Sequence, residues 1–160
     1  MVRMGELHVS QDPEHVLAAI GLGSCIGLVL LDCTRRRAGL AHIVLPSSES
    51  GARGDTGKFA DRAVPALLQG MSSIGAPRQR LQAILVGGAQ MFAVGSSALD
   101  IGKRNEQATR EALTSAGVDV HAADTGGNQG RTVRVYVGSG RVTVKGPGAT
   151  ETELFAGAAR

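Results

Sequence analysis

Two apolar runs separated by a short polar stretch dominate the first third of the chain. Residues 25–32 and 38–45 are almost continuously hydrophobic, whereas Asp32, Thr34 and three arginines lie between them. Short apolar runs bounded by turn residues are typical of buried strands, and so short a connection favours antiparallel pairing. We therefore predict a buried hairpin, preceded by a weaker strand over residues 6–10.

Helical and extended patterns alternate further along the chain. Apolar residues recur at helical spacing over residues 58–73 and 101–116, although Pro65 is dissonant within the first helix. Strands are predicted at residues 81–86, 118–123, 132–137 and 141–145. This order predicts an α/β sandwich with much antiparallel sheet, rather than a regular βαβ repeat.

Glycine-rich and polar stretches mark the loops. Residues 47–57 and 124–130 combine glycine with small polar side chains, which is typical of loops and turns. Gly87-Gly88 is interpreted as a tight turn, and Asn105 as a helix residue without a chemical role. No element is predicted from about residue 147 onward, so the tail is expected to be loosely ordered.

Length and composition narrow the class of protein. A chain of 160 residues has the size of one domain, and we predict a single domain over residues 1–160. No apolar run approaches the roughly 18 residues of a membrane span, and the first residues lack a secretory h-region. We therefore expect a cytoplasmic protein without membrane insertion. Because only 2% of the residues are aromatic, stacking platforms for single-stranded nucleic acid are not expected. The net charge of +3 is mild, and the cluster Arg35–Arg37 is interpreted as an exposed turn.

The stretch GLGSCIGL, residues 21–28, allows three interpretations of Cys25. It could fill a small apolar gap, belong to a phosphate-binding loop, or act as a nucleophile. A dinucleotide fingerprint requires glycine where this chain has Ile26, and no Walker-type loop occurs. The four histidines are scattered without metal-ligand spacing, so neither a metal nor a cofactor is expected. A disulfide is also not expected, because Cys33 lies eight residues from Cys25 on the same predicted strand.

A partner for Cys25 is available on the return strand. In the predicted hairpin, His42 lies opposite Cys25 or within a residue of it, and paired Cβ atoms are about 5 Å apart. Nearby backbone N–H groups would lower the pKa of the thiol and form an oxyanion hole. These residues therefore suit nucleophilic catalysis, but a buried structural cysteine remains an alternative.

The motifs along the chain resemble the CheD family, the chemoreceptor glutamine deamidases of bacterial chemotaxis. The resemblance rests on LGSCIGLVLLD, GLAHIVLPSS, VGGAQMF, IGKRN and DTGGNQGRTVRV, which occur in this order between about residues 18 and 144. It implies a three-layer α/β/β sandwich with largely antiparallel sheets and two main helices. It also implies a cysteine hydrolase in which Cys25 is the nucleophile and His42 its partner.

One position of the implied catalytic group is unmatched. The family has a threonine six residues before its cysteine, and this chain has Ala19 there. Alanine can neither orient an imidazole nor fix its tautomer, so full, reduced and absent activity all stay open. The candidate substitutes are Ser24, Ser47 and Ser48.

The resemblance implies a function and its partners. The expected reaction converts specific glutamine side chains in the cytoplasmic helical region of methyl-accepting chemoreceptors to glutamate and releases ammonia. The same residues would hydrolyse glutamyl methyl esters. Alternatively, Ala19 marks a member that binds and regulates a CheC-type phosphatase or a receptor.

Overall fold

The computed structural model of the protein describes residues 1–48, 54, 56–91 and 100–157. These residues form two α-helices, α1 (Ala60–Ser73) and α2 (Ile101–Ser115), and a 3-10 helix, η1 (Arg78–Arg80). They also form nine strands: β1 (Leu7–Ser10), β2 (Val16–Leu22), β3 (Ile26–Asp32), β4 (Arg37–Ile43), β5 (Gln82–Gly87), β6 (Val120–Thr125), β7 (Arg131–Tyr136), β8 (Arg141–Lys145) and β9 (Thr152–Phe155).

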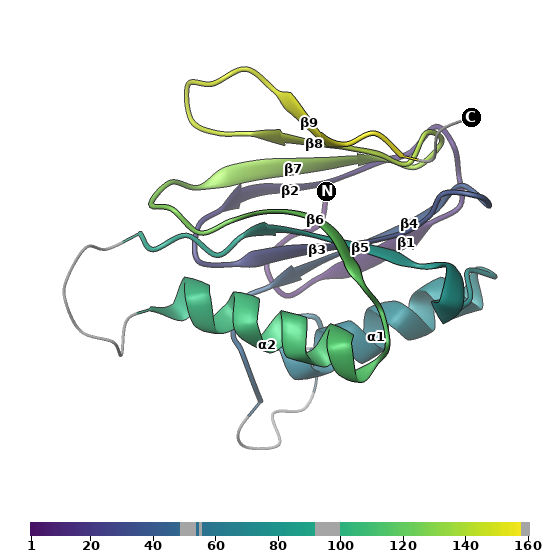
Figure 1. Ribbon diagram of the computed structural model, residues 1–160, viewed down its shortest axis with the longest axis horizontal. Coiled ribbons are helices and arrows are strands. Elements are labelled where there is room, and N and C mark those ends of the chain that lie inside the picture. The colour runs from purple at the N-terminus through teal and green to yellow at the C-terminus, as the bar shows by residue number, and fades with distance from the viewer. Residues whose placement is uncertain (49–53, 55, 92–99, 158–160) are drawn as a thin grey trace.

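The elements are stacked in three layers. A five-stranded sheet has the order β1-β4-β3-β5-β6, and a four-stranded sheet has the order β2-β7-β8-β9. Figure 1 shows both helices against one face of the five-stranded sheet and the second sheet against its other face. The neighbours are antiparallel except β5 and β6. The predicted α/β/β sandwich with largely antiparallel sheets is confirmed.

Strand β3 lies at the centre of this arrangement because it can be buried on both faces. All seven of its residues are buried. Ile26, Leu28 and Leu30 pack into the core beneath the helices. Val29 and Leu31 pack into the core between the sheets. The period of two along a strand thus assigns alternate residues to separate cores.

Both predicted helices are present. Helix α1 buries an apolar stripe, whereas the buried face of α2 includes the polar side chains of Asn105 and Thr109. Helix α1 contains Pro65 on its exposed side, and the helix continues through this residue. Helix α2 begins after Asp100, whose carboxylate accepts a hydrogen bond from the Lys103 N–H. This contact satisfies one of the free N–H groups of the first turn. The predicted hairpins β3–β4 and β7–β8 are also confirmed.

Two strands have no counterpart in the sequence prediction. Strand β2 has apolar residues on its outer face as well, where Val16 and Ile20 are exposed. Its sequence therefore lacks the alternation of polar and apolar residues that predicts a strand. Strand β9 pairs only with β8 and is short and half-exposed. Both are edge strands of the four-stranded sheet.

Some predicted features fall outside the described residues. These are residues 49–53 and 55 of the loop predicted at 47–57, Phe92 of the VGGAQMF motif, and the last three residues of the tail. Within the described part of the chain, no helix is both long and apolar enough to cross a membrane.

Candidate active site

Several chain segments meet at one end of the sandwich, at the left of Figure 1. The segment between β2 and β3 contains Cys25, and β4 carries His42 near its carboxyl end. The residues that follow β5, the β6–β7 loop and the start of α2 lie at the same end. The fold therefore brings together parts of all five motifs quoted above.

The β3–β4 register places Cys25 and His42 on the same face of the five-stranded sheet. His42 pairs with Gly27, not with Cys25. The predicted pairing, direct or within a residue, is therefore wrong: the hairpin pairs Asp32 with Arg37, and this register corresponds to Val44 opposite Cys25. Residues two apart on a strand share a face, and Cys25 packs in the core between the two sheets, on the face of Gly27. A Cβ atom built on Gly27 would lie 2.9 Å from Leu22 Cδ1. The shared face is thus the one toward the four-stranded sheet.

The thiol of Cys25 is almost fully enclosed. The residue is 9% exposed and packs in the core between the two sheets. Burial raises the pKa of the Cys25 thiol, and a smaller opposing effect comes from its own backbone N–H. The prediction that backbone donors lower this pKa is therefore wrong for the free protein, because desolvation of a thiolate outweighs them.

The imidazole of His42 is also buried, at 3% exposure. Its Nδ1 lies 3.2 Å from the carbonyl oxygen of Val2. Its Nε2 is buried and has no hydrogen-bond partner among the described residues. Burial lowers the pKa of His42, although the Val2 carbonyl and the negative charge of Glu6 act in the opposite direction. At neutral pH the site therefore holds a thiol and a neutral imidazole.

Three successive carbonyl groups of the Cys25 segment are held by hydrogen bonds. The carbonyls of Gly23 and Cys25 accept from the backbone N–H groups of Ala89 and Gly88, each at 2.8 Å. The Ser24 carbonyl accepts from Asn105 Nδ2 at 2.9 Å. Since all three carbonyls are engaged, the backbone around Cys25 is fixed before any substrate arrives.

Asn105 is the functional residue that sequence reasoning missed. It is fully buried in α2, and its Nδ2 also donates to the Val44 carbonyl at 2.9 Å. One side-chain amide therefore joins the segment that carries Cys25 to the residue two positions after His42. A buried amide that spans two strands constrains their separation. The only signal in the sequence was an asparagine in an otherwise amphipathic helix.

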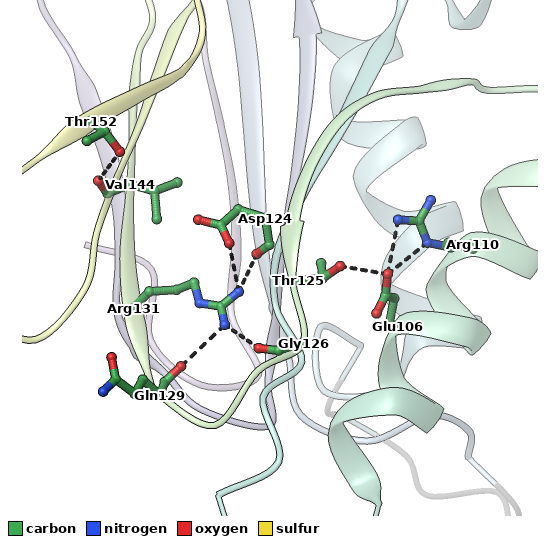
Figure 2. Close-up of polar contacts among 9 residues, drawn as sticks. All are labelled: Glu106, Arg110, Asp124, Thr125, Gly126, Gln129, Arg131, Val144 and Thr152. Carbon is green, nitrogen blue, oxygen red and sulfur yellow. Dashed lines mark hydrogen bonds and ion pairs between the residues drawn. The ribbon is translucent and has the colours of Figure 1, made fainter.

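The β6–β7 loop is organised by Arg131. Figure 2 shows its guanidinium group pointing into the loop, where it donates to the backbone carbonyls of Asp124, Gly126 and Gln129. It also pairs with the Asp124 carboxylate at 3.0 Å. The loop in turn contacts the residues after β5, because Gln90 N–H donates to the Gly127 carbonyl. The turn predicted at residues 124–130 is thus a built part of this end of the molecule.

A family model described as "CheD chemotactic sensory transduction" matches residues 44–146, which is more than half of the chain. The chain belongs to the CheD family. The resemblance inferred from the motifs is therefore confirmed.

Relatives in the CheD family match along nearly the whole chain. The three described here are each named "Probable chemoreceptor glutamine deamidase CheD". One from Symbiobacterium thermophilum is 42% identical over 157 residues, covering 96% of this chain and 95% of its own length. One from Caldanaerobacter subterraneus is 44% identical over 147 residues, with 90% of each covered. One from Methanococcus vannielii is 40% identical over 144 residues, covering 90% of this chain and 92% of its own. The first alignment leaves so few residues out that it spans both Cys25 and His42.

Ala19, where the resemblance implies a threonine, faces the core between the two sheets. Ala19 on β2 is fully buried there, in the same core as Cys25. The serine substitutes considered above form no hydrogen bond with the His42 ring. Ser48 donates its hydroxyl to Asp61, and Ser47 lies exposed beyond the end of β4. Ser24 contributes its carbonyl to Asn105. Within the described part of the chain, no side-chain hydroxyl therefore orients this imidazole by a hydrogen bond.

Proposed function

We propose that this protein deamidates glutamine side chains of chemoreceptors, with Cys25 as the nucleophile and His42 as the general acid and base. The observation that carries the proposal is the placement of these two groups on one face of the sheet, beside a backbone that is already fixed. Membership of the CheD family and the printed names of the relatives support the choice of substrate.

The reaction begins from neutral partners. Nε2 of His42 takes the thiol proton as Cys25 Sγ attacks the carboxamide carbon of the glutamine. The tetrahedral intermediate collapses when the imidazolium returns this proton to the leaving nitrogen, which departs as ammonia. The product of this half-reaction is a thioester between Cys25 and the glutamyl side chain.

Hydrolysis of the thioester regenerates the enzyme. Nε2 accepts a proton from a water molecule, the resulting hydroxide attacks the thioester carbon, and the Cys25 thiolate leaves and is reprotonated by the imidazolium. Glutamate is released. A glutamyl methyl ester would follow the same course with methanol as the leaving group, so we propose esterase activity as a secondary reaction.

Backbone N–H groups supply the oxyanion contacts in this proposal. Because the carbonyls of Gly23, Ser24 and Cys25 are bonded on one side of the segment, its N–H groups are held in fixed orientations. Donors that need no reorganisation stabilise the developing negative charge best. The burial that raises the pKa of Cys25 also excludes water, which strengthens each of these contacts.

A second candidate function is binding without turnover. Two observations favour it: the raised pKa of the Cys25 thiol, and the apolar side chain of Ala19 where the family has a hydroxyl. Under this alternative the protein binds a CheC-type phosphatase or a receptor and regulates it. The two functions make opposite predictions for glutamine chemistry.

Mass spectrometry of a receptor fragment separates them. The cytoplasmic helical region of a cognate receptor is incubated with the protein, and conversion of glutamine to glutamate is read by peptide mass. We expect conversion with the wild-type protein and none with Cys25→Ala. Cys33→Ala is the matched control because it removes the other thiol, at the far end of β3, and it should retain full activity. Conversion by Cys25→Ala would disprove the nucleophile, and no conversion by the wild type, together with tight phosphatase binding, would favour the second function.

A further inference from the structure

We infer that the main-chain carbonyl of Val2 is the positioning group of His42, so that the backbone of residues 2–6, here called the N-terminal segment, is required for catalysis. The catalytic part of this inference rests on the proposed function. The structural part, which concerns the ring nitrogen of His42 that carries the proton, does not depend on the proposed function.

The N-terminal segment is fixed to both sheets. Val2 is 1% exposed, and its N–H donates to the Ala18 carbonyl on β2 at 2.7 Å. The segment then follows β4, where Gly5 N–H donates to the His42 carbonyl at 2.9 Å and His42 N–H donates to the Glu6 carbonyl at 3.0 Å. His42 is therefore held by this segment at its backbone as well as at its ring.

The contact with Val2 decides the tautomer of His42. A backbone carbonyl can only accept a hydrogen bond, so Nδ1, 3.2 Å from the Val2 oxygen, must carry the proton. In the neutral ring Nε2 then has a free lone pair, and it is this nitrogen that has no partner among the described residues. The bond made by one ring nitrogen fixes the role of the other. The Val2 carbonyl thus leaves Nε2 ready to accept the thiol proton.

A second group of the same segment supports the charged form of the ring. The carboxylate of Glu6 accepts a hydrogen bond from Arg3 N–H at 2.9 Å, which closes the segment on itself. Its negative charge favours the imidazolium that forms during the reaction, as does the Val2 carbonyl. In this structure, the N-terminal segment therefore provides the functions that a side-chain orienting group would provide, and Ala19 provides none of them.

Nitrogen-15 NMR of selectively labelled histidine tests the inference directly. The wild-type protein at neutral pH should show His42 with the proton on Nδ1. Removal of residues 1–3, so that the chain begins at Met4, deletes the Val2 carbonyl. We then expect the ring to shift toward the Nε2–H tautomer that neutral histidine prefers in water. The kcat for deamidation should fall by about tenfold, the size of one hydrogen bond, with little change in KM.

A control variant at Met4 separates the role of the Val2 carbonyl from a general change in the N-terminal segment. Met4→Gln alters the same segment at a side chain that is 70% exposed, and it should change neither the tautomer nor kcat. A wild-type ring protonated on Nε2 would overturn the inference without any variant, which matters if the shortened chain does not fold. A shortened chain that retains kcat and the Nδ1 proton would also overturn it. If the wild type has no deamidase activity, the proposed function fails while the tautomer still tests this inference.

Discussion

Replacement of Asn105 by leucine should separate the two catalytic strands without opening a cavity. Leucine has the same number and branching of side-chain heavy atoms but cannot donate to the carbonyls of Ser24 and Val44, which Asn105 Nδ2 reaches at 2.9 Å each. The two carbonyls then lose their partner inside the protein. The Cys25 segment is no longer tied to the end of β4, so the proposed nucleophile and base lose their fixed separation.

The expected magnitude follows from the groups left unpaired. Each buried carbonyl without a partner costs about 1–3 kcal/mol. Leucine also removes Asn105 Oδ1, which is itself buried without a partner among the described residues, and this offsets part of the loss. We expect the free energy of unfolding to fall by about 1–3 kcal/mol and Tm by roughly 3–10 °C. Misplacement of catalytic groups should lower kcat by about 10- to 100-fold.

The assay is deamidation of a receptor fragment well below the Tm of the variant, with Tm measured in parallel. Thr109→Val is the matched control because its buried hydroxyl donates within α2, to the Asn105 carbonyl, and not to the catalytic strands. This control should lose about 1 kcal/mol of stability and retain kcat. If Asn105→Leu retains wild-type kcat, then Asn105 does not position the site, whatever happens to Tm.

Four further predictions follow from the site and its supporting loops. Because burial raises the pKa of Cys25, its alkylation by iodoacetamide should accelerate only above the ordinary thiol value of about pH 8.5; rapid alkylation at pH 7 would contradict this. Burial lowers the pKa of His42, so the imidazole binds a proton more readily in the unfolded chain than in the folded protein. The free energy of unfolding should therefore decline as pH falls below about 6.5. In denaturant titrations, His42→Gln should reduce that decline. Gly87→Ala places a Cβ atom 2.2 Å from the Cys25 carbonyl oxygen. It should lower the free energy of unfolding by about 1–3 kcal/mol more than Gly117→Ala does, because Gly117 also has a positive φ but nothing lies within 4 Å of its Cβ position. Equal losses of stability in the two variants would show that the Cys25 segment can shift freely. Arg131→Lys should make the β6–β7 loop more sensitive to proteolysis and lower the free energy of unfolding by about 1–3 kcal/mol. Unchanged proteolysis would mean that a positive charge, without the several guanidinium hydrogen bonds, is enough to hold the loop.

The central strands could be predicted from the sequence because burial on both faces leaves an uninterrupted apolar run. Strands β3 and β4 follow this rule, and three residues of the turn between them, Thr34, Arg35 and Arg36, are polar and exposed. Strand β2 escaped detection since its outward positions are apolar too. Strand β9 is a short, half-exposed edge strand that owes its conformation to pairing with β8. Edge strands depend on tertiary contacts that a local pattern does not record.

The candidate site was predictable only where local patterns determine it. A shared hairpin placed Cys25 and His42 near each other, although its register pairs His42 with Gly27 rather than with Cys25. The supporting groups come from distant parts of the chain: Asn105 bonds to a carbonyl 81 positions away, and His42 bonds to one 40 positions away. The Val2 contact uses a backbone atom, which any residue type would supply. No residue pattern can therefore reveal it.

Interception of the acyl-enzyme tests the central claim most directly. With hydroxylamine present, a thioester on Cys25 would yield a hydroxamate at the target glutamine of the receptor fragment, which peptide mass spectrometry detects. The account predicts hydroxamate with the wild-type protein and with Cys33→Ala, and neither hydroxamate nor glutamate with Cys25→Ala. Glutamate formation by Cys25→Ala, or deamidation by the wild type that hydroxylamine never intercepts, would contradict covalent catalysis by Cys25.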